Sequence, residues 1–150
     1  MDGAMTMPRG GRAVGMLDEL GAIEAGAVLC LRLWAEAPDG PERAAFDADT
    51  GPFGGREALA AIGSLCDLCR DYGRRALMRH HLTCRCLGGD EACVAQVVSA
   101  ALAGERDDAM LMAALLVRAD MAPGLVVLAE RAGVALSRLA ATPAPAGRLH

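Results

Sequence analysis

The chain contains no lysine and no asparagine, and aromatic residues make up only 3% of its 150 residues. Without lysine there is no Walker-type phosphate loop, no Schiff-base lysine and no protein-kinase lysine, because each of these sites requires a flexible primary amine. Without asparagine there is no acceptor for N-linked glycosylation. These absences exclude P-loop nucleotide hydrolysis, protein kinase activity and lysine-based covalent catalysis.

All 15 basic residues are therefore arginine, and 19 acidic residues give a formal net charge of -4. A chain of 15.5 kDa has the size of one ordinary domain. Its apolar run at residues 20–35 is interrupted by Glu24 and Arg32, each costly at the centre of a bilayer, so we predict no membrane span. The start of the chain lacks the pattern of a secretory signal, and we therefore expect a cytoplasmic protein.

Apolar residues recur every three or four positions along most of the chain, a pattern typical of amphipathic helices. We predict an all-α fold, a compact helical bundle of four long helices plus one or two short ones, with no strand. The single helical domain is expected at residues 12–141, with a long loop at about 38–55. A flexible start at 1–11 and a flexible tail at 142–150 flank it.

The periodicity predicts long helices at residues 12–36, 56–73 and 91–103 and from near 120 onward, and short helical pieces at 75–81 and 110–117. The piece at 110–117 is apolar on every side, which predicts a buried helix at the centre of the bundle. Glu24 falls inside the apolar stripe of the first helix. We expect it to pair with an arginine at the edge of the core.

Five of the six cysteines lie between residues 66 and 93, together with the adjacent His80 and His81. In a cytoplasmic chain such thiols are free or bind metal rather than form disulfides. Cys30 and Cys69 lie on apolar helix faces, where a thiol packs as a small hydrophobe.

Zinc prefers about four soft or borderline ligands in a tetrahedral array. Cys84 and Cys86 lie on a Gly-rich turn, Cys93 follows in the first turn of a helix, and His80 or His81 precedes them. We therefore predict a structural or regulatory zinc site formed by His80, Cys84, Cys86 and Cys93, with His81 as the alternative histidine. Packed or exposed thiols without metal are the alternative.

The residues from 70 to 85 include five arginines and one aspartate. This local excess of positive charge in an acidic chain predicts a surface for an anion or an acidic protein partner. Pairing of these arginines with the surplus carboxylates is the alternative. We do not expect nucleic-acid binding, because the rest of the chain is acidic and offers few aromatic rings for bases. The candidate residues are Arg70, Arg74, Arg75, Arg79 and Arg85.

No catalytic signature is found, since none of Ser64, Ser99 and Ser137 lies in a G-x-S-x-G elbow. Leu29 and Leu33 lie on the far side of the first predicted helix, which predicts an exposed apolar patch and a homodimer.

Four segments carry a resemblance: residues 75–80 (RALMRH), 84–91 (CRCLGGDE), 108–111 (DAML) and 117–123 (VRADMAP). With these segments, residues 56–140 resemble small uncharacterised all-helical proteins of alphaproteobacteria. The resemblance implies a bacterial, cytoplasmic origin and no particular activity.

We therefore predict a small, non-enzymatic helical protein whose Cys/His-rich turn binds a metal, zinc being favoured. A metal-free protein-interaction module is one alternative. A thiol–disulfide redox switch, which requires thiols of lowered pKa near cations such as Arg79 and Arg85, is another.

Overall fold

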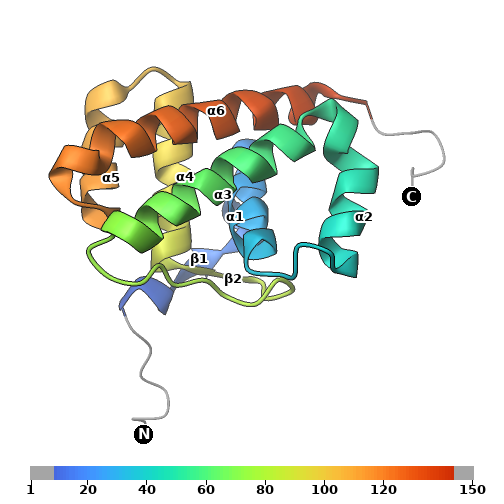
Figure 1. Ribbon diagram of the computed structural model, residues 1–150, viewed down its shortest axis with the longest axis horizontal. Helices are drawn as coiled ribbons and strands as arrows, with labels where there is room; N and C mark the ends of the chain where they lie inside the picture. Colours follow the sequence, from blue (N-terminus) through green and yellow to red (C-terminus); the bar gives the residue numbers. More distant parts are fainter. Residues whose placement is uncertain (1–8, 144–150) are drawn as a thin grey trace, which may run out of the picture.

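A computed structural model describes residues 9–143, which form a mostly helical fold with one small sheet (Figure 1). The helical class agrees with the prediction, whereas a bundle of four long helices with one or two short ones is not confirmed. The described residues form six α-helices: α1 (Ala22–Trp34), α2 (Pro41–Thr50), α3 (Gly55–Tyr72), α4 (Gly89–Leu102), α5 (Arg106–Leu116) and α6 (Ala122–Ala141). The strands are β1 (Ala13–Met16) and β2 (Cys86–Gly88), which pair antiparallel.

The long helices α3 and α6 lie side by side across the molecule, and α4 packs against both α6 and α1 (Figure 1). On α6 the buried residues Leu125, Ala129, Ala132 and Leu136 recur at three- and four-residue intervals, which places them on one face. Many core side chains are alanine, so the helices approach closely. One main hydrophobic cluster joins α1, α3, α4, α5 and α6.

The helix predicted at residues 12–36 begins only at Ala22, and the expectation of no strand is wrong. Residues 13–16 form β1, in which Ala13 pairs with Gly88 and Met16 with Cys86. The glycines at positions 10, 11, 15 and 21 disfavour a helix here. Part of the predicted flexible start is packed, because Gly10 and Gly11 are buried in a 3-10 turn; residues 1–8, like 144–150 of the predicted tail, lie outside the described part.

The predicted loop at 38–55 contains α2, which Gly40 and Pro41 begin. Proline suits the first position of a helix, because it has no N–H and its φ is already helical. Arg43 of α2 donates hydrogen bonds to the Leu33 and Trp34 carbonyls, at 3.0 and 2.6 Å, and so satisfies the end of α1. These two bonds join α2 to the end of α1.

The short helical piece predicted at 75–81 is not formed, and the chain there is irregular. Its amides bond to side chains of α4 instead: Met78 N donates to the Asp90 carboxylate at 2.8 Å, and His80 N to the Glu91 carboxylate at 3.0 Å. These two amides are therefore not available for helical hydrogen bonds.

The helices predicted at 56–73 and 91–103 are present as α3 and α4. The predicted buried central helix at 110–117 is wrong, since on α5 Leu111 and Leu115 are 70% and 67% exposed. Only Ala109, Ala113 and Leu116 of this helix are buried. Among the described residues no helix is both long and apolar enough to cross a membrane.

Two glycines with positive φ allow a test of how closely α3 packs against α6. Gly54, at φ +115°, precedes α3, and a Cβ there would overlap the Ala135 carbonyl of α6; Gly104, at φ +77°, faces open space. Gly104→Ala should lower the free energy of unfolding by about 1–2 kcal/mol, the cost of positive φ alone. Gly54→Ala should cost clearly more in urea denaturation, because φ +115° lies farther from the left-handed region open to alanine and the new Cβ adds the steric overlap. Equal losses of unfolding free energy in the two variants would contradict close packing of α3 against α6.

Candidate functional site

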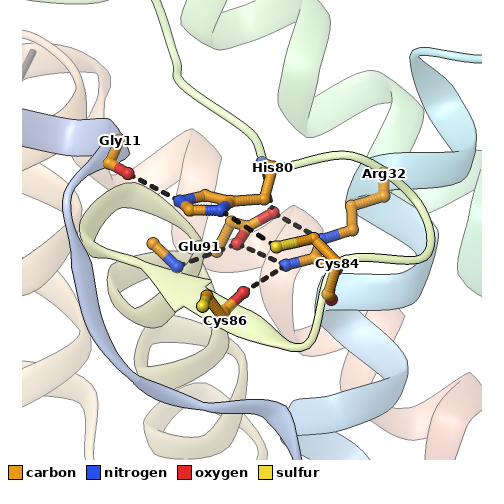
Figure 2. A network of polar contacts seen from close by, with 7 residues as sticks. Gly11, Arg32, His80, Cys84, Cys86 and Glu91 are labelled. Carbon is orange, nitrogen blue, oxygen red and sulfur yellow. Dashed lines mark hydrogen bonds and ion pairs between the residues drawn. The ribbon is translucent and has the colours of Figure 1, made fainter. Parts of the chain in front are cut away.

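A buried ion pair between Arg32, in the last turn of α1, and Glu91, in the first turn of α4, lies beneath the Cys/His-rich turn (Figure 2). Arg32 Nε lies 2.7 Å from Glu91 Oε2, and Nη2 lies 2.9 Å from Oε1. Both side chains are at most 1% exposed. Arg32 Nη1 also donates to the Cys84 carbonyl, and Nη2 donates to the Cys86 carbonyl at 2.7 Å.

The Glu91 carboxylate also accepts hydrogen bonds from the backbone amides of Gly88 and His80, each at 3.0 Å. Burial by itself raises the pKa of the Glu91 carboxyl, but Arg32 and these two amides lower it below its ordinary value. Since the pKa is depressed in the folded state, the stabilising contribution of Glu91 is present at neutral pH and is lost as the pH falls through the lowered pKa.

The neighbouring Asp90 binds the start of the same irregular segment, at residues 75–78. Its side chain is 4% exposed and accepts hydrogen bonds from both terminal nitrogens of Arg75, Nη2 at 2.7 Å and Nη1 at 2.8 Å. With the amide of Met78 as a third donor, Asp90 fixes the backbone that leads to His80. Two adjacent carboxylates of α4 therefore position the irregular segment before the turn.

Figure 2 shows the His80 ring lying between the Gly11 carbonyl and the Cys84 side chain. His80 Nε2 is 2.6 Å from Gly11 O, and because a carbonyl only accepts, Nε2 carries the hydrogen. Nδ1 then faces Cys84 Sγ at 3.5 Å. The ring fits against Gly88, where a Cβ would lie 2.8 Å from His80 Cδ2. This arrangement leaves Nδ1 of the neutral ring free to accept the thiol proton.

Cys84 and His80 shift each other's pKa in the directions that favour transfer of the thiol proton to the imidazole. The hydrogen bond to His80 lowers the pKa of the Cys84 thiol, and a hydrogen bond from the Cys86 amide and contact with the Cys86 side chain lower it further. In turn, the hydrogen bond to Cys84 raises the pKa of His80. Cys84 is also partly exposed. These are the properties of a reactive thiol rather than of a core cysteine.

The structure brings three of the four predicted metal ligands together and places the fourth apart. His80, Cys84 and Cys86 share the turn, whereas Cys93 Sγ faces α5, 3.5 Å from the Met112 carbonyl. Burial raises the pKa of Cys93 to about 11. Between residues 9 and 143 no group of three or more His, Cys, Asp or Glu side chains is arranged to hold a metal ion. His81, the alternative ligand, is exposed. Zinc binding stays a prediction.

The chain matches no protein-family model, no curated protein and no solved structure. The resemblance to proteins of alphaproteobacteria therefore stays a prediction as well. Function has to be argued from the geometry of the site.

The remaining cysteines are buried, as expected for Cys30 and Cys69, which lie in the main core with Cys66. Burial raises the pKa of Cys30 and of Cys69 to about 12. These thiols pack as small apolar groups and are unreactive at neutral pH.

The five candidate arginines divide into different roles. Arg70 pairs with the exposed Asp67 and Asp71, and Arg75 with Asp90, so for these two the predicted alternative of pairing with carboxylates holds. Arg74 Nε bonds to the Ala114 carbonyl at 2.6 Å. Arg85 is exposed on the turn.

Arg79, like Arg74 and Arg85, forms no ion pair with a carboxylate of residues 9–143, and it differs from the other four because its buried Nε has no hydrogen-bond partner there. A buried donor without a partner costs about 1–3 kcal/mol. Arg79 lines a cavity together with Arg70 and Arg75.

The sequence reasoning missed Arg32 and Glu91 as site residues and placed the buried charge at Glu24. Glu24 is only partly buried and forms no ion pair among the described residues. The sequence places Arg32 four residues after Val28, on the same face of α1, but the burial of that face is visible only in the structure.

Removing the buried cation tests whether the site depends on it. Arg32→Met should lower the free energy of unfolding by about 3–5 kcal/mol, because Glu91 is left buried without its partner. The matched control is Arg56→Met, which breaks an exposed pair with Asp47 and should leave the stability close to wild type. Urea denaturation measures both. Similar stabilities of the two variants would show that the buried pair is dispensable.

Proposed function

We propose that the Cys84–His80 pair is the centre of a thiol–disulfide switch that responds to hydroperoxides, with Cys86 as the second thiol. The observation that carries the proposal is the 3.5 Å contact between His80 Nδ1 and Cys84 Sγ, with the ring oriented by the Gly11 carbonyl. A partly exposed thiol beside a fixed imidazole forms a thiolate readily, and the thiolate is the nucleophile.

The reaction has two steps. The Cys84 proton passes to His80 Nδ1 and the thiolate attacks an oxygen of hydrogen peroxide; an S–O bond forms, the O–O bond breaks, and the leaving oxygen takes the proton from His80 and departs as water. Cys86 then attacks the sulfur of the resulting sulfenic acid; an S–S bond forms, and the hydroxyl leaves with the Cys86 proton as a second water. Two thiols are oxidised and one peroxide is reduced.

Hydrogen bonds also connect the turn to the buried ion pair, so that oxidation of the turn would affect the core. The carbonyls of Cys84 and Cys86 both accept hydrogen bonds from Arg32, which is paired with Glu91. A disulfide across Cys84 and Cys86 changes the backbone between these carbonyls, so it alters the bonds of the buried ion pair. Such a switch operates in a reducing compartment, which fits the expected cytoplasmic location.

The second candidate is zinc binding by the same residues. An S···N separation of 3.5 Å is close to the ligand–ligand edge of a tetrahedral zinc site with Zn–S of about 2.3 Å and Zn–N of about 2.0 Å. A histidine ligand that donates its other nitrogen to a carbonyl, as His80 does to Gly11, is common around zinc. Cys86 would be the third ligand. Bound zinc would protect both thiols from oxidation.

Mild oxidation separates the two candidates. After treatment of the untagged protein with hydrogen peroxide, we expect the mass to fall by two hydrogens, with the disulfide mapped to Cys84 and Cys86 by peptide mass spectrometry. His80→Phe should slow the reaction at least about tenfold, because the proton acceptor is lost. The matched control Cys93→Ser should react like wild type, since Cys93 lies apart from the turn.

A disulfide elsewhere, or an unchanged mass in metal-free protein, would contradict the switch. One zinc ion per chain in the purified protein, with Cys84 resistant to oxidation until a chelator is added, would instead support the zinc site.

We also propose that the chain forms a homodimer through α5. The expected patch of Leu29 and Leu33 is not formed as such, because Leu33 is 3% exposed and only Leu29 reaches the surface. On α5, however, Leu111 and Leu115 lie one turn apart and are 70% and 67% exposed. Two large apolar side chains so close together favour contact with a second copy over an acidic partner.

Light scattering at micromolar concentration tests the dimer. We expect a dimeric mass for the wild type and a monomeric mass for Leu111→Glu, because a buried carboxylate in the interface is costly. Leu29→Glu, on a different surface, is the control and should remain dimeric. A monomeric wild type would refute the proposal.

A further inference from the structure

The cavity lined by Arg79, of about 540 Å³, lies between the end of α1, the second half of α3 and the irregular segment after it. Its volume is within the range of about 300–1,000 Å³ that is usual for small-molecule sites. The thiol pair of Cys84 and His80 is not part of its lining. Its lining includes Trp34, Cys66, Asp67, Arg70, Leu77 and Arg79.

The lining has an apolar part and a cationic part. Trp34 and Leu77 supply apolar surface, together with the thiol of Cys66. The cationic part consists of Arg70, Arg75 and Arg79, against Asp67 as the one carboxylate in the lining. A cavity of this composition is complementary to a ligand with an apolar body and a negatively charged end.

The wall formed by Trp34 is held in place from both neighbouring helices. The Arg43 guanidinium lies 4.3 Å from the centroid of the Trp34 ring, and Gly63 of α3 is so close that a Cβ there would overlap the ring. The apolar side of the cavity is therefore formed before any ligand binds, which lowers the ordering cost of binding.

Arg79 is the cation with unused hydrogen-bonding capacity. Arg75 forms an ion pair with the buried Asp90. Arg70 forms ion pairs with two exposed aspartates, and these pairs contribute little to stability because water screens the charges. Arg79 contacts the Cys66 sulfur, but its Nε, although buried, has no hydrogen-bond partner among the described residues. A guanidinium offers its terminal nitrogens as a planar fork that fits the two oxygens of a carboxylate or phosphate.

We infer that this cavity binds a small organic anion whose carboxylate or phosphate group meets Arg79 while its apolar body lies against Trp34 and Leu77. Arg70 is the second cation within the same lining. The inference does not depend on the switch at Cys84, because it uses a different cavity and different side chains.

Titrations followed by the ¹H–¹⁵N signals of the arginine Nε–H groups test the inference on the full chain. The probes are 1-naphthoate and 1-naphthyl phosphate, with 1-naphthalenemethanol as the uncharged control. We expect the Arg79 Nε–H signal, assigned by its absence in Arg79→Lys, to shift saturably with either anion and to stay in place with the alcohol. The tighter of the two anions identifies the preferred head group.

Variants decide whether Arg79 carries the binding. Arg79→Met should weaken binding of the preferred anion at least tenfold, and Arg79→Lys should weaken it less, because a cation is retained. Arg131→Met is the matched control, since Arg131 lines a separate groove between α3 and α6, and it should bind like wild type. Equal binding of the alcohol, an unshifted Arg79 signal, or loss of binding in Arg131→Met alone would overturn the inference. Backbone spectra of each variant verify that it is folded.

Discussion

The buried pair of Arg32 and Glu91 is the interaction on which the local structure depends. Removing two charges from water is costly, and the cost is offset only when the ions are paired and their other hydrogen bonds are satisfied. Here two backbone carbonyls accept hydrogen bonds from Arg32, and two backbone amides donate to Glu91. All four backbone groups belong to residues 80–88. The hydrogen bonds that offset the cost of burying the ion pair therefore also fix a turn with little secondary structure of its own.

This arrangement explains how the Cys84–His80 pair is held in place on an irregular segment. Loops present functional side chains well when a rigid scaffold positions them. The amide of His80 is held by Glu91, its ring by the Gly11 carbonyl, and the carbonyl of Cys84 by Arg32. The S···N contact thus depends on α1, α4 and the residues just before β1, which are distant in sequence and meet only in the fold.

The sequence predicted what depends on local periodicity and missed what depends on remote partners. The helices α3 and α4 were predictable because alanine, leucine and valine repeat on one face. The strand β1 was not predictable, because three α-helices separate it in the chain from its partner β2. For the site, the turn and its ligand-rich character were predictable from Cys84, Cys86 and His80. The ion pair beneath was not, since Arg32 reads as an ordinary charge near a helix end and Glu91 as an ordinary residue of a helix start.

The thiol pair and the anion cavity are separate sites that share one stretch of backbone. Arg79 and His80 are adjacent in the chain; Arg79 lines the cavity, and His80 turns toward Gly11 and Cys84. Between them runs the peptide whose amide donates to Glu91. A change at the turn that displaced this peptide would move Arg79 as well, and a ligand held by Arg79 would resist that displacement. Because linkage between two binding or chemical equilibria is reciprocal, an anion that favours the reduced arrangement must bind less tightly to the oxidised one.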